Sequence, residues 1–168
     1  MKFLLCACYL AAAGILAFFI GRLLAGHRFR YDAFPFRSFD FEQDGQLYKR
    51  LRVSAWQSRV PDMSRICRKL MPPKKLEGRP DESTLRQMIN ETCIAELIHL
   101  LLCVTGLAVL WLWPGTGGLV VWLVYCIFGN LPFIVIQRYN RPRFARLLRR
   151  CAGKETENER ADFKLQHG

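Results

Sequence analysis

Two long stretches of this 168-residue chain contain no charged residue, although 23% of all its residues are charged. Nineteen uncharged residues lie between Lys2 and Arg22, and 41 lie between Glu96 and Arg138. An α-helix rises about 1.5 Å per residue, so about 20 residues are enough to cross the roughly 30 Å hydrocarbon core of a bilayer. The two stretches therefore predict membrane-spanning helices, and their apolar content excludes an intrinsically disordered chain.

We predict an all-α integral membrane protein with three transmembrane helices. Residues 1–21 form an N-terminal anchor, and residues 95–137 contain two more spans. Proline and three glycines at residues 114–118 predict a tight turn between these two spans, which makes them an antiparallel helical hairpin. Residues 1–26 also fit a cleaved signal peptide. The anchor is favoured because the apolar run is long for a signal peptide and arginines follow it, as they do after a stop-transfer segment.

The basic residues predict how the chain is oriented in a bacterial cell membrane. Residues 22–93 contain 15 lysines and arginines, and residues 138–168 contain nine. Because positive residues flank spans on the inner side, the segments 22–94 and 138–168 are expected to be cytoplasmic, with the N-terminus and the hairpin turn outside. The net charge of +11 then indicates anionic lipid headgroups as partners. No nucleic-acid-binding motif is present.

Between the spans, several segments have the composition of structures that lie at the membrane interface. Aromatic residues alternate with charges over residues 28–41, and helical periodicity follows over residues 41–56. Residues 60–64 and Pro72-Pro73 predict breaks, and Asp81-Glu82-Ser83 predicts a helix start. Residues 143–148 predict a short amphipathic helix on the inner surface, and residues 153–168 are expected to be loose.

Seven cysteines are present, but none is part of a C-x-x-C pair. We therefore expect no structural disulfide and no zinc or other metal site. Cys93, where the second span enters the membrane, could serve as an acyl-carrying nucleophile, although a small apolar residue is the favoured interpretation. No cofactor is expected beyond an acyl donor substrate such as acyl-CoA or acyl-ACP.

Polar residues at membrane depth are costly and are therefore candidates for function. Glu96 and His99 are three residues apart at the start of the second span, so both project from one helix face. Asn130 lies in the third span, about 10 Å from its cytoplasmic end at 1.5 Å per residue. Because the hairpin is antiparallel, these residues should converge with those that close the third span, namely Gln137, Arg138, Asn140 and Arg141.

Such a cluster is suited to acyl transfer onto a hydroxyl group. A histidine held by a carboxylate can accept a proton from an alcohol, and arginine and asparagine can stabilise an oxyanion or bind a phosphate. A purely structural role for the Glu96 and His99 pair remains open at this point. A metal site built on Glu-x-x-His would need further ligands, and only His27 and His167 remain as other histidines.

A second pattern has the spacing of a known catalytic motif. His27 and Asp32 form His-x4-Asp, the spacing found in glycerolipid acyltransferases, directly after the first span. The glycines and proline that usually accompany that motif are absent. We therefore do not assign His27 and Asp32 to the site.

Several motifs together resemble the glycosyl-4,4'-diaponeurosporenoate acyltransferases, small bacterial membrane enzymes of staphyloxanthin-type carotenoid synthesis. The resemblance extends over about residues 36–149 and is most specific at residues 95–99 and 137–143. Its motifs are Phe39-Asp40-Phe41-Glu42 with Gly45 and Tyr48, Val53 to Trp56 with Val60-Pro61-Asp62, Glu91-Thr92-Cys93, Ala95-Glu96-Leu97-Ile98-His99, Asn130-Leu131-Pro132, and Gln137-Arg138-Tyr139-Asn140-Arg141-Pro142-Arg143.

The resemblance implies an O-acyltransferase that esterifies a sugar hydroxyl of a glycosylated carotenoid with a fatty acyl chain. Residues 61–75 depart from the family pattern, so another amphiphilic glycolipid is an alternative acceptor. Our hypothesis makes His99 the general base and Glu96 the residue that orients it, with Arg138 and Arg141 anchoring anionic groups. The predicted substrate-binding set is Asn130, Gln137, Arg138, Asn140, Arg141 and Trp56.

Two further questions stay open at the level of sequence. The alternative function is a non-catalytic membrane scaffold or assembly protein that binds anionic lipid through its basic face. A chain with three spans also has little interior in which to enclose a lipid substrate. Either the middle segment folds over the site, or the subunits of a homo-oligomer share it.

Overall fold

The computed structural model describes residues 1–60 and 81–167, with the backbone alone for residues 43, 44 and 154–167. All regular secondary structure in these described residues is helical. Three helical stretches are long and apolar enough to cross a membrane, namely Lys2–Leu24, Glu82–Leu112 and Thr116–Gly153. The prediction of an all-α membrane protein with three spans is confirmed. The expected breaks at residues 60–64 and 72–73, together with Cys67 and the divergent residues 61–75, lie wholly or mostly outside the described residues.

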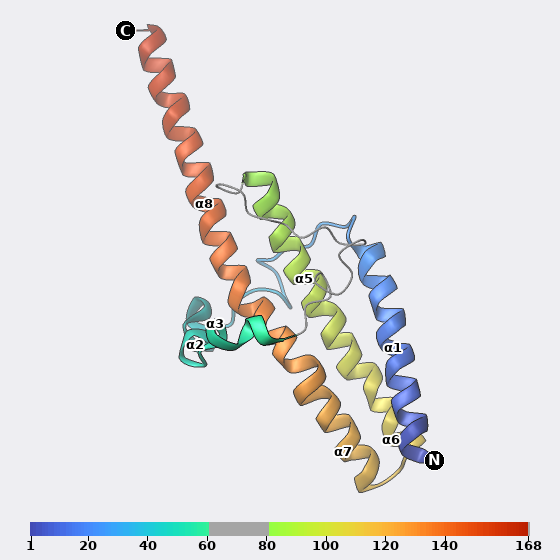
Figure 1. The fold of residues 1–168 in the computed structure, drawn as a ribbon. Coiled ribbons are helices and arrows are strands. Elements are labelled where there is room, and N and C mark those ends of the chain that lie inside the picture. Colours follow the sequence, from blue (N-terminus) through green and yellow to red (C-terminus); the bar gives the residue numbers. More distant parts are fainter. Residues whose placement is uncertain (61–80, 168) are drawn as a thin grey trace.

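The second and third spans form the expected hairpin (Figure 1). Helix α5 (Glu82–Thr105) continues through a 3₁₀ turn (Gly106–Ala108) into α6 (Val109–Leu112). The chain reverses at Gly115, whose φ of 99° favours glycine, and returns as α7 (Thr116–Val124). A Cβ on Gly118 would lie 2.0 Å from the Trp113 carbonyl oxygen, so the turn also requires glycine at that position.

The helix start predicted at residues 81–83 is confirmed. Asp81 caps α5, and its carboxylate accepts hydrogen bonds from the Thr84 N–H at 3.3 Å and the Ser83 hydroxyl at 2.6 Å. Helix α1 (Lys2–Leu24) packs against α5 along the membrane-spanning part (Figure 1). The Tyr9 hydroxyl fastens the two helices by donating to the Thr105 carbonyl at 2.9 Å.

The return arm of the hairpin is longer than the sequence suggested. After α7, a π-helical turn (Tyr125–Asn130) leads into α8 (Leu131–His167), which is one continuous helix. The separate amphipathic helix expected at residues 143–148 and the loose tail expected at 153–168 are therefore wrong. The physical reason is that α5 begins as early as Glu82. Its Leu85 and Ile89 pack against Ala145 and Leu148 of α8, so this face of α8 contacts protein rather than lipid.

The segment between α1 and residue 60 does not form the continuous helix expected over residues 41–56. It contains four short elements: a 3₁₀ helix (Asp40–Gly45), α2 (Gln46–Arg50), α3 (Val53–Trp56) and a second 3₁₀ turn (Gln57–Arg59). Positive φ angles at Gly45 (90°) and Arg52 (51°) interrupt it, because an α-helix cannot continue through the left-handed region.

Residues 25–59, which we call the strap, lie across the hairpin (Figure 1). At one end, Asn90 of α5 accepts from the Phe29 N–H at 2.8 Å and donates to the His27 carbonyl at 2.7 Å. At the other end, Tyr48 and Val53 are buried against Tyr139 of α8. The strap thus connects α1 to the face where α5 and α8 meet.

Candidate active site

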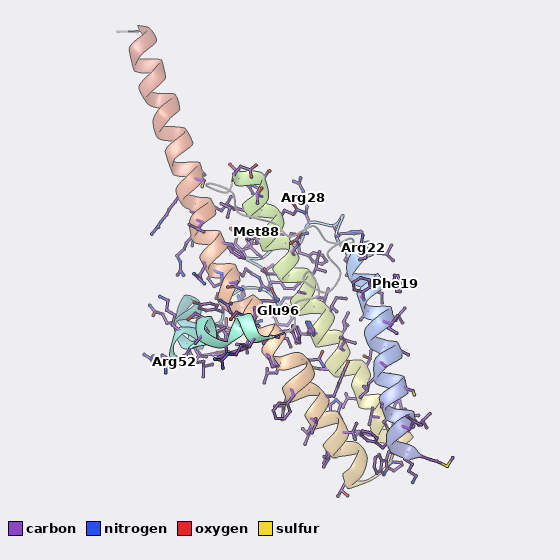
Figure 2. The ribbon with its side chains drawn as sticks, in the orientation of Figure 1. Phe19, Arg22, Arg28, Arg52, Met88 and Glu96 are labelled. Atoms are coloured by element: carbon purple, nitrogen blue, oxygen red, sulfur yellow. The ribbon has the colours of Figure 1, made fainter. Side chains whose placement is uncertain are left out.

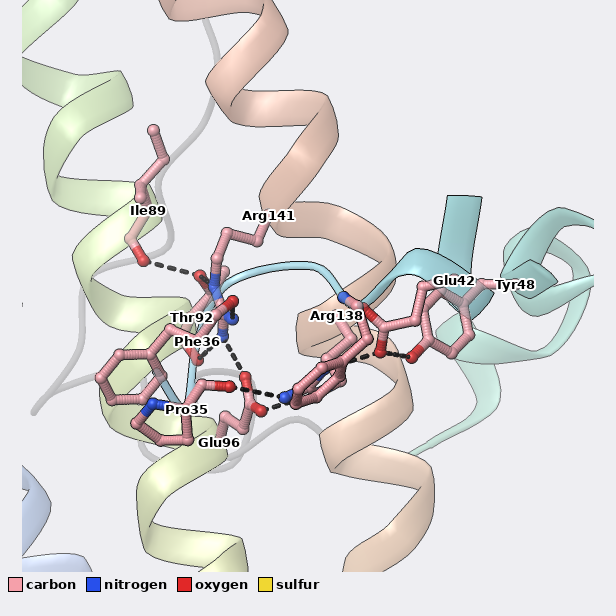
Figure 3. Close-up of polar contacts among 10 residues, drawn as sticks. Pro35, Phe36, Glu42, Tyr48, Ile89, Thr92, Glu96, Arg138 and Arg141 are labelled. Carbon is pink, nitrogen blue, oxygen red and sulfur yellow. Dashed lines mark hydrogen bonds and ion pairs between the residues drawn. The ribbon is translucent and has the colours of Figure 1, made fainter. Parts of the chain in front are cut away.

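The centre of the hairpin contains a buried cluster of Glu42, Glu96, Arg138 and Arg141, which we call the Glu96 network (Figure 3). Glu96 of α5 has no exposed surface. Its Oε1 accepts from Arg138 Nε at 2.7 Å, and its Oε2 accepts from Arg141 Nη2. Arg138 Nη1 also donates to Glu42 Oε1 of the strap at 2.6 Å. Two carboxylates balance two guanidinium groups, which is the condition under which such charges can be buried.

Both arginines also fasten the strap to α8. Arg138 Nη2 donates to the Pro35 carbonyl at 2.7 Å, and Arg141 Nη1 donates to the Phe36 carbonyl at 2.6 Å. The guanidinium of Arg138 lies 4.7 Å from the centre of the Phe39 ring, and that of Arg141 lies 5.4 Å from the centre of the Phe36 ring. The network is therefore a joint between three segments of the chain.

Thr92 and Tyr48 also form hydrogen bonds with the Glu96 network. Arg141 donates to Thr92 Oγ1 at 3.0 Å and to the Thr92 carbonyl at 3.1 Å. The Tyr48 hydroxyl donates to Glu42 Oε1 at 2.5 Å, and burial of the phenol raises the pKa of Tyr48, which keeps the proton needed for this bond. Within the described part of the chain, no buried side-chain nitrogen or oxygen lacks a hydrogen-bond partner.

Next to the Glu96 network, the side chain of His99 on α5 is hydrogen-bonded to that of Asn130. His99 Nδ1 lies 3.0 Å from Asn130 Oδ1, while Asn130 Nδ2 donates to the Tyr125 carbonyl at 3.0 Å. A carbonyl can only accept, so the amide nitrogen must face Tyr125 and the amide oxygen must face the imidazole. This bonding places a proton on Nδ1, so in the neutral imidazole the lone pair is on Nε2.

The surroundings hold this pair in place. The ring of Phe133 stacks on His99 with centroids 4.5 Å apart and planes 8° from parallel. Asn130 is 1% exposed and comes from the π-helical turn that precedes α8. Such turns often occur at functional sites. The arrangement can accept a proton at Nε2 of a fixed imidazole.

The structure brings together most of the residues that the antiparallel hairpin predicted, but it pairs them differently. Glu96, Arg138 and Arg141 meet in one cluster, and His99 meets Asn130. The expectation that Glu96 orients His99 is wrong, since both oxygens of Glu96 bind arginines and Asn130 takes its place. Two charged donors outcompete a neutral imidazole for a buried carboxylate, because charge-assisted hydrogen bonds are about twice as strong as neutral ones.

Three other predicted residues lie around the contact between the strap and α8. Trp56 Nε1 donates to the Leu51 carbonyl at 3.2 Å, and the ring packs against the Tyr48, Val53 and Tyr139 cluster. Asn140 Nδ2 lies 3.5 Å from Gln57 Oε1. Gln137 is partly buried on α8. Their role in substrate binding stays a prediction.

The remaining candidates lie apart from His99. His27 is exposed, and Asp32 forms an ion pair with Arg30 at 3.1 Å, so the His-x4-Asp pattern does not form a hydrogen-bonded pair. Cys93 is fully buried. The described residues contain no group of three His, Cys, Asp or Glu side chains that could hold a metal ion.

Sequence reasoning missed Glu42, Thr92 and Tyr48 as parts of the cluster. A charge balance could have found Glu42: two arginines close the third span, whereas Glu96 is the single carboxylate between Glu91 and the start of the C-terminal segment. A second carboxylate was needed, and it comes from an aromatic stretch that is able to enter the membrane interface. Thr92 gave no such signal.

Fold and site define a small helical membrane protein with a buried charged cluster and a hydrogen-bonded histidine beside it. The family model of glycosyl-4,4'-diaponeurosporenoate acyltransferase matches residues 31–150, which include the strap from Tyr31 onwards, the hairpin and every residue described in the cluster and the His99 pair. The chain belongs to this family.

Curated relatives agree with the family model. Proteins named glycosyl-4,4'-diaponeurosporenoate acyltransferase from Staphylococcus aureus strains MRSA252 and N315 are each 32% identical to the chain, over 133 and 134 residues. The matches cover 77% of this chain and 78% of each relative. No solved structure matches the chain.

The Glu96 network leads to a prediction about stability. Replacing Glu96 by Gln leaves the buried guanidinium of Arg141 without its counter-charge, so the free energy of unfolding should fall by about 3–5 kcal/mol. The matched control is Glu91→Gln on the same helix, where the side chain is exposed and the change should stay within about 0.5 kcal/mol. Unfolding of the purified protein in mixed micelles measures both. Equal losses in the two variants would contradict the structural role of Glu96.

Proposed function

We propose that this protein transfers a fatty acyl group to a sugar hydroxyl of an amphiphilic glycolipid. The acceptor that the relatives' name indicates is a glycosylated C30 carotenoid acid. The observation that carries the proposal is the His99 and Asn130 pair, which presents an unprotonated Nε2 in a membrane-spanning helix. Family membership supports the reaction class.

His99 acts as the general base in this proposal. Its Nε2 takes the proton from the sugar hydroxyl, whose oxygen attacks the carbonyl carbon of the acyl donor. The new ester C–O bond forms, the bond between the acyl carbon and the donor's leaving group breaks, and the protonated Nε2 returns its proton to that leaving group. Asn130 is a positioning residue, because it holds Nδ1–H and so keeps the lone pair on Nε2.

The Glu96 network fixes the register of the two helices that carry this pair. His99 follows Glu96 by three residues on α5, and Asn130 precedes Arg138 by eight residues, or about 12 Å of helix. A slip of one helix turn would separate His99 from Asn130 and both arginines from Glu96. Arg138 and Arg141 thus serve catalysis by holding α5, α8 and the strap together. Trp56, Gln137 and Asn140 are proposed to contact the acceptor.

We further propose that the strap and the carboxyl end of α8 face the cytoplasm. The support is the density of lysine and arginine in residues 22–93 and 138–168, against the uncharged turn at residues 114–118. In this orientation the Glu96 network lies at the inner edge of the bilayer. The His99 pair lies slightly deeper, within reach of a lipid acceptor.

This orientation can be tested with reporters. A phosphatase that is active only outside the cytoplasm should be active when inserted after Gly115 and inactive when fused after Gly168. The expected pattern follows from the cost of moving nine basic residues across the membrane. The opposite pattern would overturn the proposed orientation.

The catalytic proposal predicts a separation of kcat from KM. Replacing His99 by Gln should lower kcat by about 10²–10⁴-fold, because general-base catalysis contributes this much. KM for both substrates should change little, since His99 acts on the proton rather than on binding. Replacing Asn130 by Ala should lower kcat less, by about tenfold, because the imidazole remains but its tautomer is no longer held.

The control is His27→Gln, which alters an exposed histidine outside the cluster and should leave both constants unchanged. The assay uses purified protein with an acyl donor and a glycosylated carotenoid acid. Undiminished product formation by the His99→Gln protein would contradict the proposal and would favour the non-catalytic scaffold.

A further inference from the structure

A cleft of about 220 Å³ lies between the strap and α8. Three members of the Glu96 network line it, namely Glu42, Arg138 and Arg141. On the α8 side it is lined by residues at positions i, i+3, i+4, i+7 and i+11, which share one helix face, namely Arg138, Arg141, Pro142, Ala145 and Arg149. The small side chain of Ala145 leaves room between the longer ones. Tyr31, Phe36, Arg37 and Ser38 line the cleft from the strap.

The charges around this cleft do not cancel. Arg138 and Arg141 are neutralised by Glu42 and Glu96, as described above. The carboxylate of Asp32, which also lines the cleft, is paired with Arg30 at 3.1 Å. Two further arginines line the cleft.

These two are Arg37 and Arg149, which are both exposed. The structure shows no carboxylate partner for either of them within residues 1–60 and 81–153. The hydroxyl groups of Tyr31 and Ser38 add neutral donors to the lining. The cleft therefore offers two guanidinium groups that pair with no carboxylate among the described side chains, and its lining also contains hydroxyl groups. This donor set suits a phosphate group.

We propose that this cleft binds the phosphate group of the acyl donor. The proposal rests on the proposed acyl transfer and names the chemistry of its second substrate. An arginine binds phosphate through a planar fork of N–H donors, and two arginines on opposite walls can grip one phosphate from both sides. Arg138 and Arg141 are held by their own carboxylates, so Arg37 and Arg149 carry the recognition.

The distance to the base selects the kind of donor. Phe133, which stacks on His99, precedes Ala145 by twelve residues and Arg149 by sixteen on α8, or about 18 Å and about 24 Å of helix. A helical side chain covers the turn before its own Cα, so the Arg149 guanidinium can bind near the level of Ala145. In a phospholipid the phosphate is only a few bonds from the ester carbonyls, so it could not occupy the cleft while its acyl carbon reached His99. A phosphopantetheine arm has about the length of five extended residues, roughly 17 Å. The geometry points to a thioester donor with this arm.

Binding of phosphopantetheine to the full chain in neutral detergent tests the proposal by calorimetry without requiring turnover. Replacing both Arg37 and Arg149 by Gln should weaken binding at least about tenfold, because each lost charged hydrogen bond costs this much. The matched control is Arg28→Gln with Arg150→Gln, two exposed arginines outside the cleft lining that give the same change in net charge. Binding to the unaltered chain should also weaken at high salt.

Two comparisons separate the possible outcomes. The His99→Gln protein should bind phosphopantetheine normally, so a failure of catalysis and a failure of this cleft are distinguishable. Micelles that contain phosphatidylglycerol should not displace phosphopantetheine. Displacement by that lipid would overturn the thioester assignment in favour of a phospholipid headgroup. Equal binding by the two double variants would overturn the cleft as a phosphate site.

Discussion

The ion pairs of Glu96 with Arg138 and Arg141 are the interaction on which the rest of this structure depends. A fully buried carboxylate is tolerated because two arginines from the opposite helix bind both of its oxygens. Leucine and valine side chains alone would allow α5 and α8 to slide, since lipid tails are as apolar as the helices. The charged cluster removes that freedom, because a slip of one turn would leave charges unpaired inside the protein.

The same cluster explains how a chain with so little interior can build a site. The strap has few regular elements of its own, yet the carbonyls of Pro35 and Phe36 and the carboxylate of Glu42 bind the arginines of α8 (Figure 3). Figure 2 shows Glu96 where the strap, α5 and α8 come together. The strap thereby forms one wall of the cleft lined by Arg37 and Arg149. The Glu96 network thus positions His99, the two helices and the proposed donor site.

The sequence predicted the features that follow from long-range segregation of charge. Three spans, the hairpin and the convergence of Glu96 with Arg138 and Arg141 all result from uncharged stretches and an antiparallel turn. The sequence did not predict the length of α8, because whether residues 143–148 bind lipid or protein depends on how far α5 extends. It also did not reveal the partner of His99, since the spacing alone allowed either Asn130 or Glu96 and the choice depends on what else competes for Glu96.

The strap was the least predictable part for a related reason. Two of its hydrogen bonds with α8 are accepted by backbone carbonyls, which carry no sequence signal, and its turns occur at Gly45 and Arg52. Glu42 and Tyr48 were noticed as parts of a motif, but their bond to each other and to Arg138 required the three-dimensional arrangement. Contacts that depend on a common partner cannot be recognised from the separate positions of the residues in the sequence.

In the proposed mechanism, His99 presents the lone pair of Nε2 because Asn130 holds the proton on Nδ1. Nitrogen-15 NMR of the full chain in micelles, labelled at histidine, reports this tautomer directly, and the His99→Gln protein identifies the signal. At a pH where the imidazole is neutral, we expect a protonated Nδ1 and an unprotonated Nε2. A His99 signal with the proton on Nε2, or an even mixture of both tautomers, would contradict it.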